Sequence, residues 1–221
     1  MEQALQEFEQ DDEIKAVIVT GTGDKAFSAG ADILEAVDAP PEVVARRNAV
    51  SGRLSWYIAT YPKPIIGAIN GLAYGGAALM SSLFDIRIGC ERTRFRYLAA
   101  SYGRVNSTWS LPTQIGLPKA KELMFTGRVV EAQEAKEIGL LNQLVPSELL
   151  MSTALEIAKL IANNNPLMVQ GIKRLVNEGV GMGWRQRYDL EVEARNDWLV
   201  ATPAEEGFAD FLARKGRKPQ R

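Results

Sequence analysis

The stretch from residue 64 to residue 89 constrains the fold more than any other part of the chain. An apolar run at 64–69 (PIIGAI) is followed by Asn70-Gly71, by a glycine-containing segment that becomes helix-forming at 72–83, and by a second short run at 85–89 (DIRIG). Short β-branched runs bounded by glycine predict buried strands. The order strand, loop, helix, strand favours a largely parallel sheet with helices packed on its faces.

The rest of the chain extends this pattern. Residues 15–20 (KAVIVT) predict a further buried strand, whereas from Pro118 onward the sequence is dominated by helix formers, often with proline in the first turn. The expected helices occupy residues 1–10, 118–125, 132–138, 146–163, 166–200 and 203–213. We therefore expect an α/β core at 1–142 and a helical region at 143–221.

Charge and composition exclude several classes of function. The 221 residues contain 26 basic and 27 acidic side chains, and this balance argues against a general affinity for nucleic acid or an anionic membrane. The chain has no histidine, which excludes Ser-His and Cys-His catalytic pairs and imidazole metal sites. A small-molecule ligand, with no bound metal, fits this composition better.

The remaining bulk features favour a cytoplasmic protein. Cys90 is the single cysteine, so no intramolecular disulfide can form, and its apolar surroundings predict a buried thiol rather than a nucleophile. No apolar run reaches the roughly 20 residues that cross a bilayer. The acidic, amphipathic segment 1–10 lacks the pattern of a targeting sequence.

Two glycine-rich segments are candidates for chemistry. The first, 21–33 (GTGDKAFSAGADI), loosely satisfies a dinucleotide-binding fingerprint, but it lacks the following helix and the acidic residue at the next strand end that such a site needs. In the second, 70–78 (NGLAYGGAA), the amides of Gly75 and Gly76 are unshielded and stand at a helix start, where they could stabilise a developing oxyanion. Close packing of a helix on a strand would explain the same glycines equally well.

Together the two segments resemble the signature regions of the crotonase (enoyl-CoA hydratase/isomerase) superfamily. Residues 26–33 (AFSAGADI) look like its first oxyanion segment, and residues 66–86 (IGAINGLAYGGAALMSSLFDI) look like its second. Further similarities occur at 126–127, 132–142, Lys173 and 205–214. The resemblance implies a crotonase (ClpP/crotonase-like) fold of repeated ββα units, with an acyl-CoA site in the core at 1–142 and a trimerisation region at 143–221.

The resemblance also implies a set of site residues. The backbone amides of Ala31 and Gly76 would hold the carbonyl of an acyl-CoA thioester, and coenzyme A would enter only as part of the substrate, without a separate cofactor. Tyr102 is the candidate catalytic side chain. The residues expected to contact substrate are Ser28, Ala29, Asp32, Ile33, Tyr74, Gly75, Arg104 and Asn106, together with Phe211 and Arg214 reaching the nucleotide of a neighbouring subunit in a homotrimer or homohexamer.

The chain departs from the family pattern at positions that matter for chemistry. Leu79 and Ala99 stand where hydratases carry two glutamates, and neither can transfer a proton, so ordinary hydration should be weak. Residues 103–110 (GRVNSTWS) replace a proline- and glycine-rich stretch that faces the acyl group in relatives. Glu35 and Asp38, on the segment after the first motif, are further candidates for acid or base. Met1 falls within the family's first helix, which implies that the preceding strand and loop are missing.

Three hypotheses remain open on the sequence alone. The favoured one is an acyl-CoA enzyme that catalyses isomerisation, hydrolysis, decarboxylation or a specialised hydration. The second is a non-catalytic acyl-CoA-binding or scaffold member of the same family. The third, an RNA-associated homologue, would need a basic helical face, and the chain is basic only in its tail at 214–221.

Overall fold

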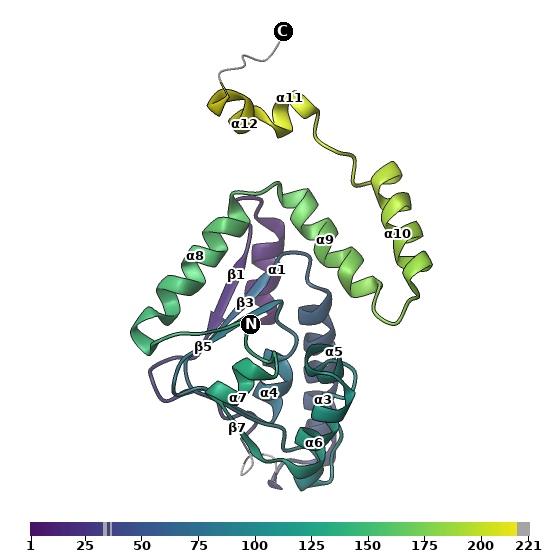
Figure 1. The fold of residues 1–221 in the computed structure, drawn as a ribbon. Helices are drawn as coiled ribbons and strands as arrows, with labels where there is room; N and C mark the ends of the chain where they lie inside the picture. The colour runs from purple at the N-terminus through teal and green to yellow at the C-terminus, as the bar shows by residue number, and fades with distance from the viewer. Residues whose placement is uncertain (33–34, 36, 216–221) are drawn as a thin grey trace. The chain divides into compact units, whose positions relative to one another are not determined.

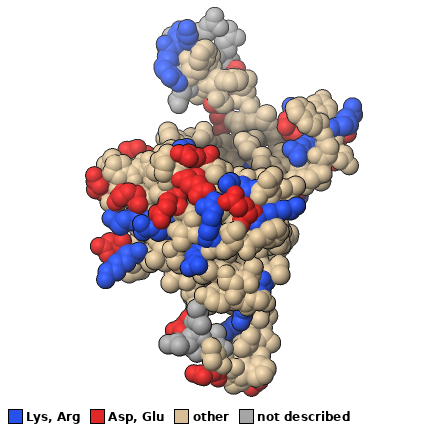
Figure 2. Space-filling model, turned by 60° about the horizontal axis from the view of Figure 1, so that its bottom comes forward, with Lys and Arg blue, Asp and Glu red and all other residues tan. Residues whose placement is uncertain are grey.

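A computed structural model describes the chain except for residues 33, 34, 36 and 216–221. The chain divides into two compact units, residues 1–170 and residues 171–221, which are described separately as unit 1 and unit 2. Among the described residues, no helix is both long and apolar enough to cross a membrane. Figure 2 shows acidic and basic side chains interspersed on the face turned to the viewer, consistent with the balanced net charge.

Unit 1 is built around two four-stranded sheets. The larger sheet is parallel throughout, with the order β1-β3-β5-β8 (Figure 1), and its strands are β1 (Val17–Thr20), β3 (Ile65–Ile69), β5 (Ile86–Gly89) and β8 (Gln143–Leu144). The smaller sheet has the order β2-β4-β6-β7 and comprises β2 (Ala26–Ser28), β4 (Leu72–Tyr74), β6 (Arg94–Arg96) and β7 (Val129–Glu131). Only β7 is antiparallel to its neighbour.

Successive strands alternate between the two sheets. β1, β3 and β5 enter the larger sheet, and each is followed by a strand of the smaller one, β2, β4 and β6. Each pair is then followed by helix: α3 (Pro41–Thr60), α4 (Gly76–Ser81), and α5 (Leu111–Ile115) with α6 (Leu117–Thr126). The expected fold class of repeated ββα units is thereby confirmed.

The remaining helices are one at the N-terminus and a series that begins at residue 132. They are α1 (Glu2–Gln10), α7 (Ala132–Glu137), α8 (Leu150–Ala162), α9 (Pro166–Glu178), α10 (Trp184–Asp197), α11 (Ala204–Gly207) and α12 (Ala209–Arg214), with single 3₁₀ turns η1 (Ala100–Tyr102) and η2 (Ser147–Leu149). α8 packs on β1, β3 and β5 and so belongs to unit 1, although the sequence placed it in a C-terminal region that begins at residue 143 (Figure 1).

Strand β3 is buried on both faces and separates two apolar clusters. Ile65 and Ile69 face the main cluster, whereas Ile66 and Ala68 face a second cluster completed by α8 and by the fully buried Cys90. Side chains alternate across a strand, so this central position requires apolar residues throughout, as the sequence run predicted.

The sequence prediction was wrong about one long helix. Residues 166–200 form α9 and α10 rather than a single element, because glycine stands at three of the five positions between Gly179 and Gly183 and Gly181 has a φ of +84°. Within unit 2, Gly171 leaves room for Leu199, and Arg174 lies over the ring of Trp198 at 4.5 Å. The helix α3 and the strands of the smaller sheet were not predicted.

We expect the stability of unit 1 to decrease in alkali because of Tyr61. Its hydroxyl is fully buried and donates a 2.8 Å hydrogen bond to the Leu5 carbonyl. Burial, and secondarily the charge of Glu9, raises the pKa of Tyr61 to about 12, whereas an unfolded tyrosine titrates near 10. The contribution of Tyr61 to the free energy of unfolding should therefore be constant below about pH 10 and decrease between about pH 10 and 12.

Denaturant unfolding at a series of pH values checks this expectation. Tyr61→Phe should cost about 1 kcal/mol at neutral pH, because the Leu5 carbonyl loses its donor. The same variant should flatten the decrease above pH 10, and a profile parallel to that of the wild type would contradict the assignment.

Candidate functional site

The two predicted glycine-rich turns lie side by side because their preceding strands are paired. β2 and β4 are parallel neighbours, with Ser28 opposite Ala73 at their carboxyl ends. The chain leaves β2 into residues 29–32 and leaves β4 into Gly75 and Gly76. Two segments 45 residues apart in the sequence therefore leave the smaller sheet side by side, at the carboxyl ends of neighbouring strands.

Gly30 marks the point of closest approach. It has a φ of +90°, and a Cβ atom at this position would lie 2.8 Å from the Tyr74 carbonyl oxygen and 3.4 Å from the Gly76 amide nitrogen. Gly30 is therefore needed both for its backbone conformation and for the space that it leaves. The backbone immediately before Ala31 therefore passes close to Tyr74 and Gly76, and it leaves no space for a side chain beside the Tyr74 carbonyl.

The amides of Ala31 and Gly76 are available for a ligand. Gly76 is the first residue of α4, where an N–H has no acceptor within the helix. No residue that the structure describes accepts a hydrogen bond from either amide, and both residues are exposed. The preceding amide is used differently, since Gly75, with a φ of +56°, donates to the Arg96 carbonyl at 2.9 Å.

A buried carboxamide fixes the neighbouring loops. Asn70 accepts a hydrogen bond from the Gly21 amide at 3.1 Å and donates to the carbonyls of Gly21 and Gly23 at 3.0 and 2.8 Å. It thereby joins the end of β3 to the turn after β1. The sequence marked Asn70 only as part of an Asn-Gly turn, and its role as a cross-link between loops was missed because the partners are 47 to 49 residues away.

The other predicted residues of the first turn are exposed or half-buried. Ser28 accepts a hydrogen bond through Oγ from the Gly30 amide at 3.2 Å, and Asp32 accepts one through Oδ1 from the Glu35 amide at 3.1 Å. Ala29 is exposed, and Ile33 lies outside the described residues. Ser28 and Asp32 therefore shape the turn through their own side chains.

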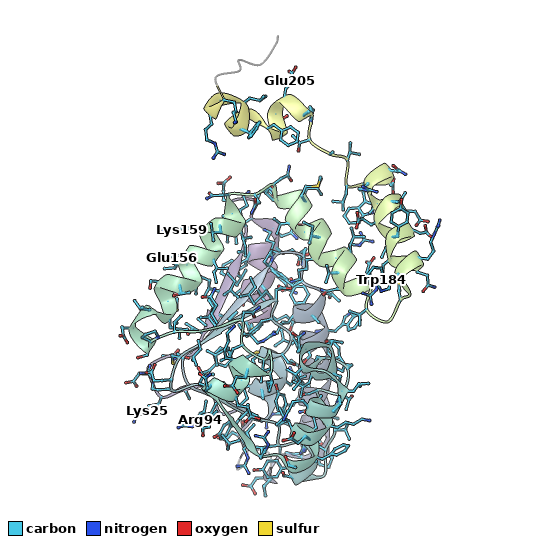
Figure 3. The ribbon with its side chains drawn as sticks, in the orientation of Figure 1. Lys25, Arg94, Glu156, Lys159, Trp184 and Glu205 are labelled. Carbon is cyan, nitrogen blue, oxygen red and sulfur yellow. The ribbon has the colours of Figure 1, made fainter. Side chains whose placement is uncertain are left out.

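Basic residues stand at the amino ends of the strands of the smaller sheet, away from the turns, which follow the carboxyl ends. Lys25 precedes β2 and Arg94 begins β6, and Figure 3 shows both at one side of unit 1. Arg94 is already paired with Glu131 of β7 at 2.8 Å. The charge of Arg94 is therefore already partnered within the smaller sheet.

Leu79 and Ala99 place hydrocarbon where the family resemblance implies carboxylates. Leu79 lies one turn after Gly76 on α4, half-buried against the main apolar cluster. Ala99 caps η1, and its carbonyl accepts hydrogen bonds from the amides of Tyr102 and Arg104 at 3.1 and 2.8 Å. Within the part of the chain that the structure describes, no three histidine, cysteine or acidic side chains form a group that could hold a metal.

The loop at 103–110 is anchored to the same helix that begins with Gly76. Ser110 Oγ lies 2.9 Å from Ser82 Oγ at the carboxyl end of α4. Ser107 is fully buried with a φ of +61°, a conformation that a residue other than glycine rarely adopts. Of the predicted pocket residues, Tyr102 and Arg104 are exposed, and Asn106 lies half-buried with its Oδ1 3.2 Å from Ser107 Oγ.

Tyr74 and the two C-terminal residues complete the predicted set. Tyr74 is half-buried and pairs in register with Arg96, whose Nε donates to the Gly127 carbonyl at 2.7 Å. Phe211 and Arg214 lie on α12 in unit 2, so they are described apart from the turns of unit 1. Phe211 is 55% exposed and borders an apolar hollow of about 350 Å³.

Known proteins similar to this chain match nearly all of it. The family model for enoyl-CoA hydratase/isomerase matches residues 1–220. The short-chain-enoyl-CoA hydratase of Clostridium acetobutylicum is 32% identical over 218 residues, covering 97% of this chain and 84% of the relative. The mitochondrial enoyl-CoA hydratase of Pongo abelii is 30% identical over 221 residues, covering 97% and 74%. A crystal structure of an enoyl-CoA hydratase from Bacillus anthracis matches with a TM-score of 0.89 at 32% identity, covering 99% of this chain and 85% of that one.

Replacing Gly30 should test how closely the two turns approach. Gly30→Ala should lower the free energy of unfolding by about 1 to 3 kcal/mol more than Gly23→Ala does. Both glycines have positive φ, +90° and +78°, but a Cβ at Gly23 has nothing within 4 Å, so the difference isolates the contact with the Tyr74 carbonyl. Denaturant unfolding of the two variants measures it, and equal losses would mean that the turns are farther apart.

Proposed function

Because the chain belongs to the enoyl-CoA hydratase/isomerase family, we propose that it processes acyl-CoA thioesters by holding the thioester carbonyl between the amides of Ala31 and Gly76. The observation that supports this proposal is the close approach of the two turns, because a Cβ atom built on Gly30 would lie 3.4 Å from the Gly76 amide nitrogen. The two N–H groups have no other described acceptor, so a carbonyl oxygen from outside the chain would satisfy both.

Such a pair of donors acts on the electronic structure of the thioester. Hydrogen bonds to the carbonyl oxygen favour negative charge there, which lowers the cost of an enolate or a tetrahedral oxyanion. One preorganised donor of this kind is typically worth 100- to 1,000-fold in rate, about 3 to 4 kcal/mol. The backbone supplies these donors at any pH, so the carbonyl grip needs no titrating side chain.

The same proposal assigns the binding roles. Ser28, Ala29 and Asp32 would contact coenzyme A, and Ile33, outside the described residues, belongs to the same predicted segment. Tyr74, Tyr102, Arg104 and Asn106 would line the acyl group, and Gly75 would also contact the substrate. Phe211 and Arg214 would reach the nucleotide bound by a second copy in a homotrimer or homohexamer. The exposed apolar residues of unit 2 support assembly: Ile172, Val176, Val200, Phe208 and Phe211 are each more than half exposed in the single chain.

The reaction itself should differ from ordinary hydration. Hydration needs proton transfer at the carbons next to the carbonyl, and the hydrocarbon side chains of Leu79 and Ala99 cannot provide it. We propose isomerisation, decarboxylation, hydrolysis or a specialised hydration in which carbonyl polarisation carries most of the catalysis. Tyr102, at the end of η1, is the candidate proton-handling group for such a reaction.

A second function is favoured by the same pair of substitutions. A member that binds acyl-CoA without turning it over would have no need of carboxylates at positions 79 and 99. A panel of enoyl-, malonyl- and hydroxyacyl-CoA thioesters separates the two functions. Product formation with any of them supports the enzyme, and saturable binding of several without product supports the binding protein.

The N–H donor of Gly76 can be removed by a single substitution that leaves the chain continuous. Gly76→Pro deletes the N–H at the first helical position, where proline is tolerated, and should reduce turnover of the best thioester in the panel about 100- to 1,000-fold. Gly76→Ala is the matched control, because it keeps the N–H and its Cβ has nothing within 4 Å. Steady-state rates of both variants check the expectation.

For a binding protein, the same two variants would be compared by their thioester affinity. In either case, equal behaviour of the proline and alanine variants in folded protein would remove the oxyanion role from Gly76.

Restoring two carboxylates should restore hydration. The double variant Leu79→Glu/Ala99→Glu should hydrate crotonyl-CoA at least about 100-fold faster than the wild type, because each general acid or base typically contributes 100- to 10,000-fold. Loss of the enoyl absorbance follows the reaction. Leu79→Gln/Ala99→Gln introduces the same shape without an ionisable proton, so an equal gain in the glutamine variant would contradict proton transfer as the missing step.

A further inference from the structure

Two tryptophans from distant parts of unit 1 form an exposed pair. The rings of Trp56 on α3 and Trp109 in the 103–110 loop have centroids 6.1 Å apart and planes inclined by 48°. Their side chains are 64% and 48% exposed. Large aromatic surfaces in contact are usually buried, so an exposed pair indicates a surface that receives an apolar group.

The loop that presents Trp109 is rigidly built. Ser107 is held in a left-handed conformation while fully buried, which costs of order 1 kcal/mol and persists only where the surroundings enforce it. Ser110 is bonded to Ser82, and the next residue, Leu111, is fully buried in the main cluster. Trp109 therefore stands between two fixed points.

The pair lies near the far end of the helix that starts at the Gly76 amide. From Gly76 to Ser82, where the loop is attached, α4 rises by about 9 Å. On this helix Ala77, Ala78 and Ser81 are buried, whereas Gly76 is exposed and Leu79 and Met80 are half-buried. The part of α4 that stays accessible after Gly76 is therefore hydrocarbon, from Leu79 and Met80.

We propose that Trp56 and Trp109 form the wall that binds the distal, apolar part of the acyl group and so select thioesters of medium chain length over short ones. This inference rests on the proposed function, in which the carbonyl lies at Gly76. Leu79 and Met80 would contact the carbons nearest the carbonyl, and the indole pair would cover the tail. On this proposal, a leucine in place of a carboxylate at position 79 favours binding of a hydrocarbon chain, because no charged group has to be desolvated beside it.

The proposed wall of Trp56 and Trp109 is tested by measuring the affinity for saturated acyl-CoA thioesters that differ in acyl chain length. By isothermal titration, the wild type should bind octanoyl-CoA at least about tenfold more tightly than butyryl-CoA, since each fully buried methylene contributes up to about fourfold. In Trp109→Ala, and separately in Trp56→Ala, this ratio should fall below about threefold. Affinity for free coenzyme A and for butyryl-CoA should not change.

Controls distinguish a failure of this inference from a failure of the proposed function. Trp184→Ala, which removes a tryptophan of unit 2 that is 92% exposed, should keep the wild-type ratio (Figure 3). If folded Trp109→Ala and Trp56→Ala both keep the ratio, the wall is refuted. A change in oligomeric state without a change in the ratio also refutes it and makes the pair an interface between copies. Failure of the wild type to bind any acyl-CoA would refute the proposed function itself.

Discussion

The parallel pairing of β2 with β4 is the contact on which the rest of the site depends. Ser28 and Ala73 stand opposite each other, and the backbone of Gly30 then passes so close to the Tyr74 carbonyl that a side chain would not fit, with the Gly76 amide nearby. Backbone atoms in contact have fewer ways to move than side chains, which must give up rotamer freedom to hold a position. The approach of the two turns is consequently a property of the sheet.

A site made of main-chain donors can be retained when its side chains change. Here Leu79 and Ala99 stand where proton-transferring groups are expected, while the turns at Gly30 and Gly76 keep their approach. The proposed chemistry divides accordingly into a carbonyl grip supplied by the fold and a proton-handling part that side chains near α4 and η1 would have to supply. This division explains how one scaffold can host different reactions.

Apolar surface that is not buried within the single chain gathers in two places. In unit 1 it is the indole pair of Trp56 and Trp109, set beside a loop with strained, buried Ser107. In unit 2 it is spread over α9 to α12, where few residues are fully buried. The first is small and close to the proposed acyl path, so a ligand tail suits it, whereas the second is extensive and suits a protein partner.

The sequence predicted three of the four strands of the larger sheet and the positions of the glycine turns, and it has no carboxylates at 79 and 99, but the two-residue strand β8 was not predicted. Continuous apolar runs such as 65–69 and glycines at strand ends are local signals, and local signals can be read without knowledge of the partner segments. The resemblance to the crotonase superfamily added the order of the ββα units, which the structure bears out.

Which segments meet could be learned only from the folded chain. The three-residue strands of the smaller sheet are too short to show a period, and α3 mixes polar and apolar residues without a clear stripe, so neither could be predicted. The hydrogen bonds of Asn70 to Gly21 and Gly23, the close approach of Gly30 to Gly76 and the ring contact of Trp56 with Trp109 join residues 46 to 53 positions apart. Such contacts arise from strand register and packing, because no single segment carries the information that sets them.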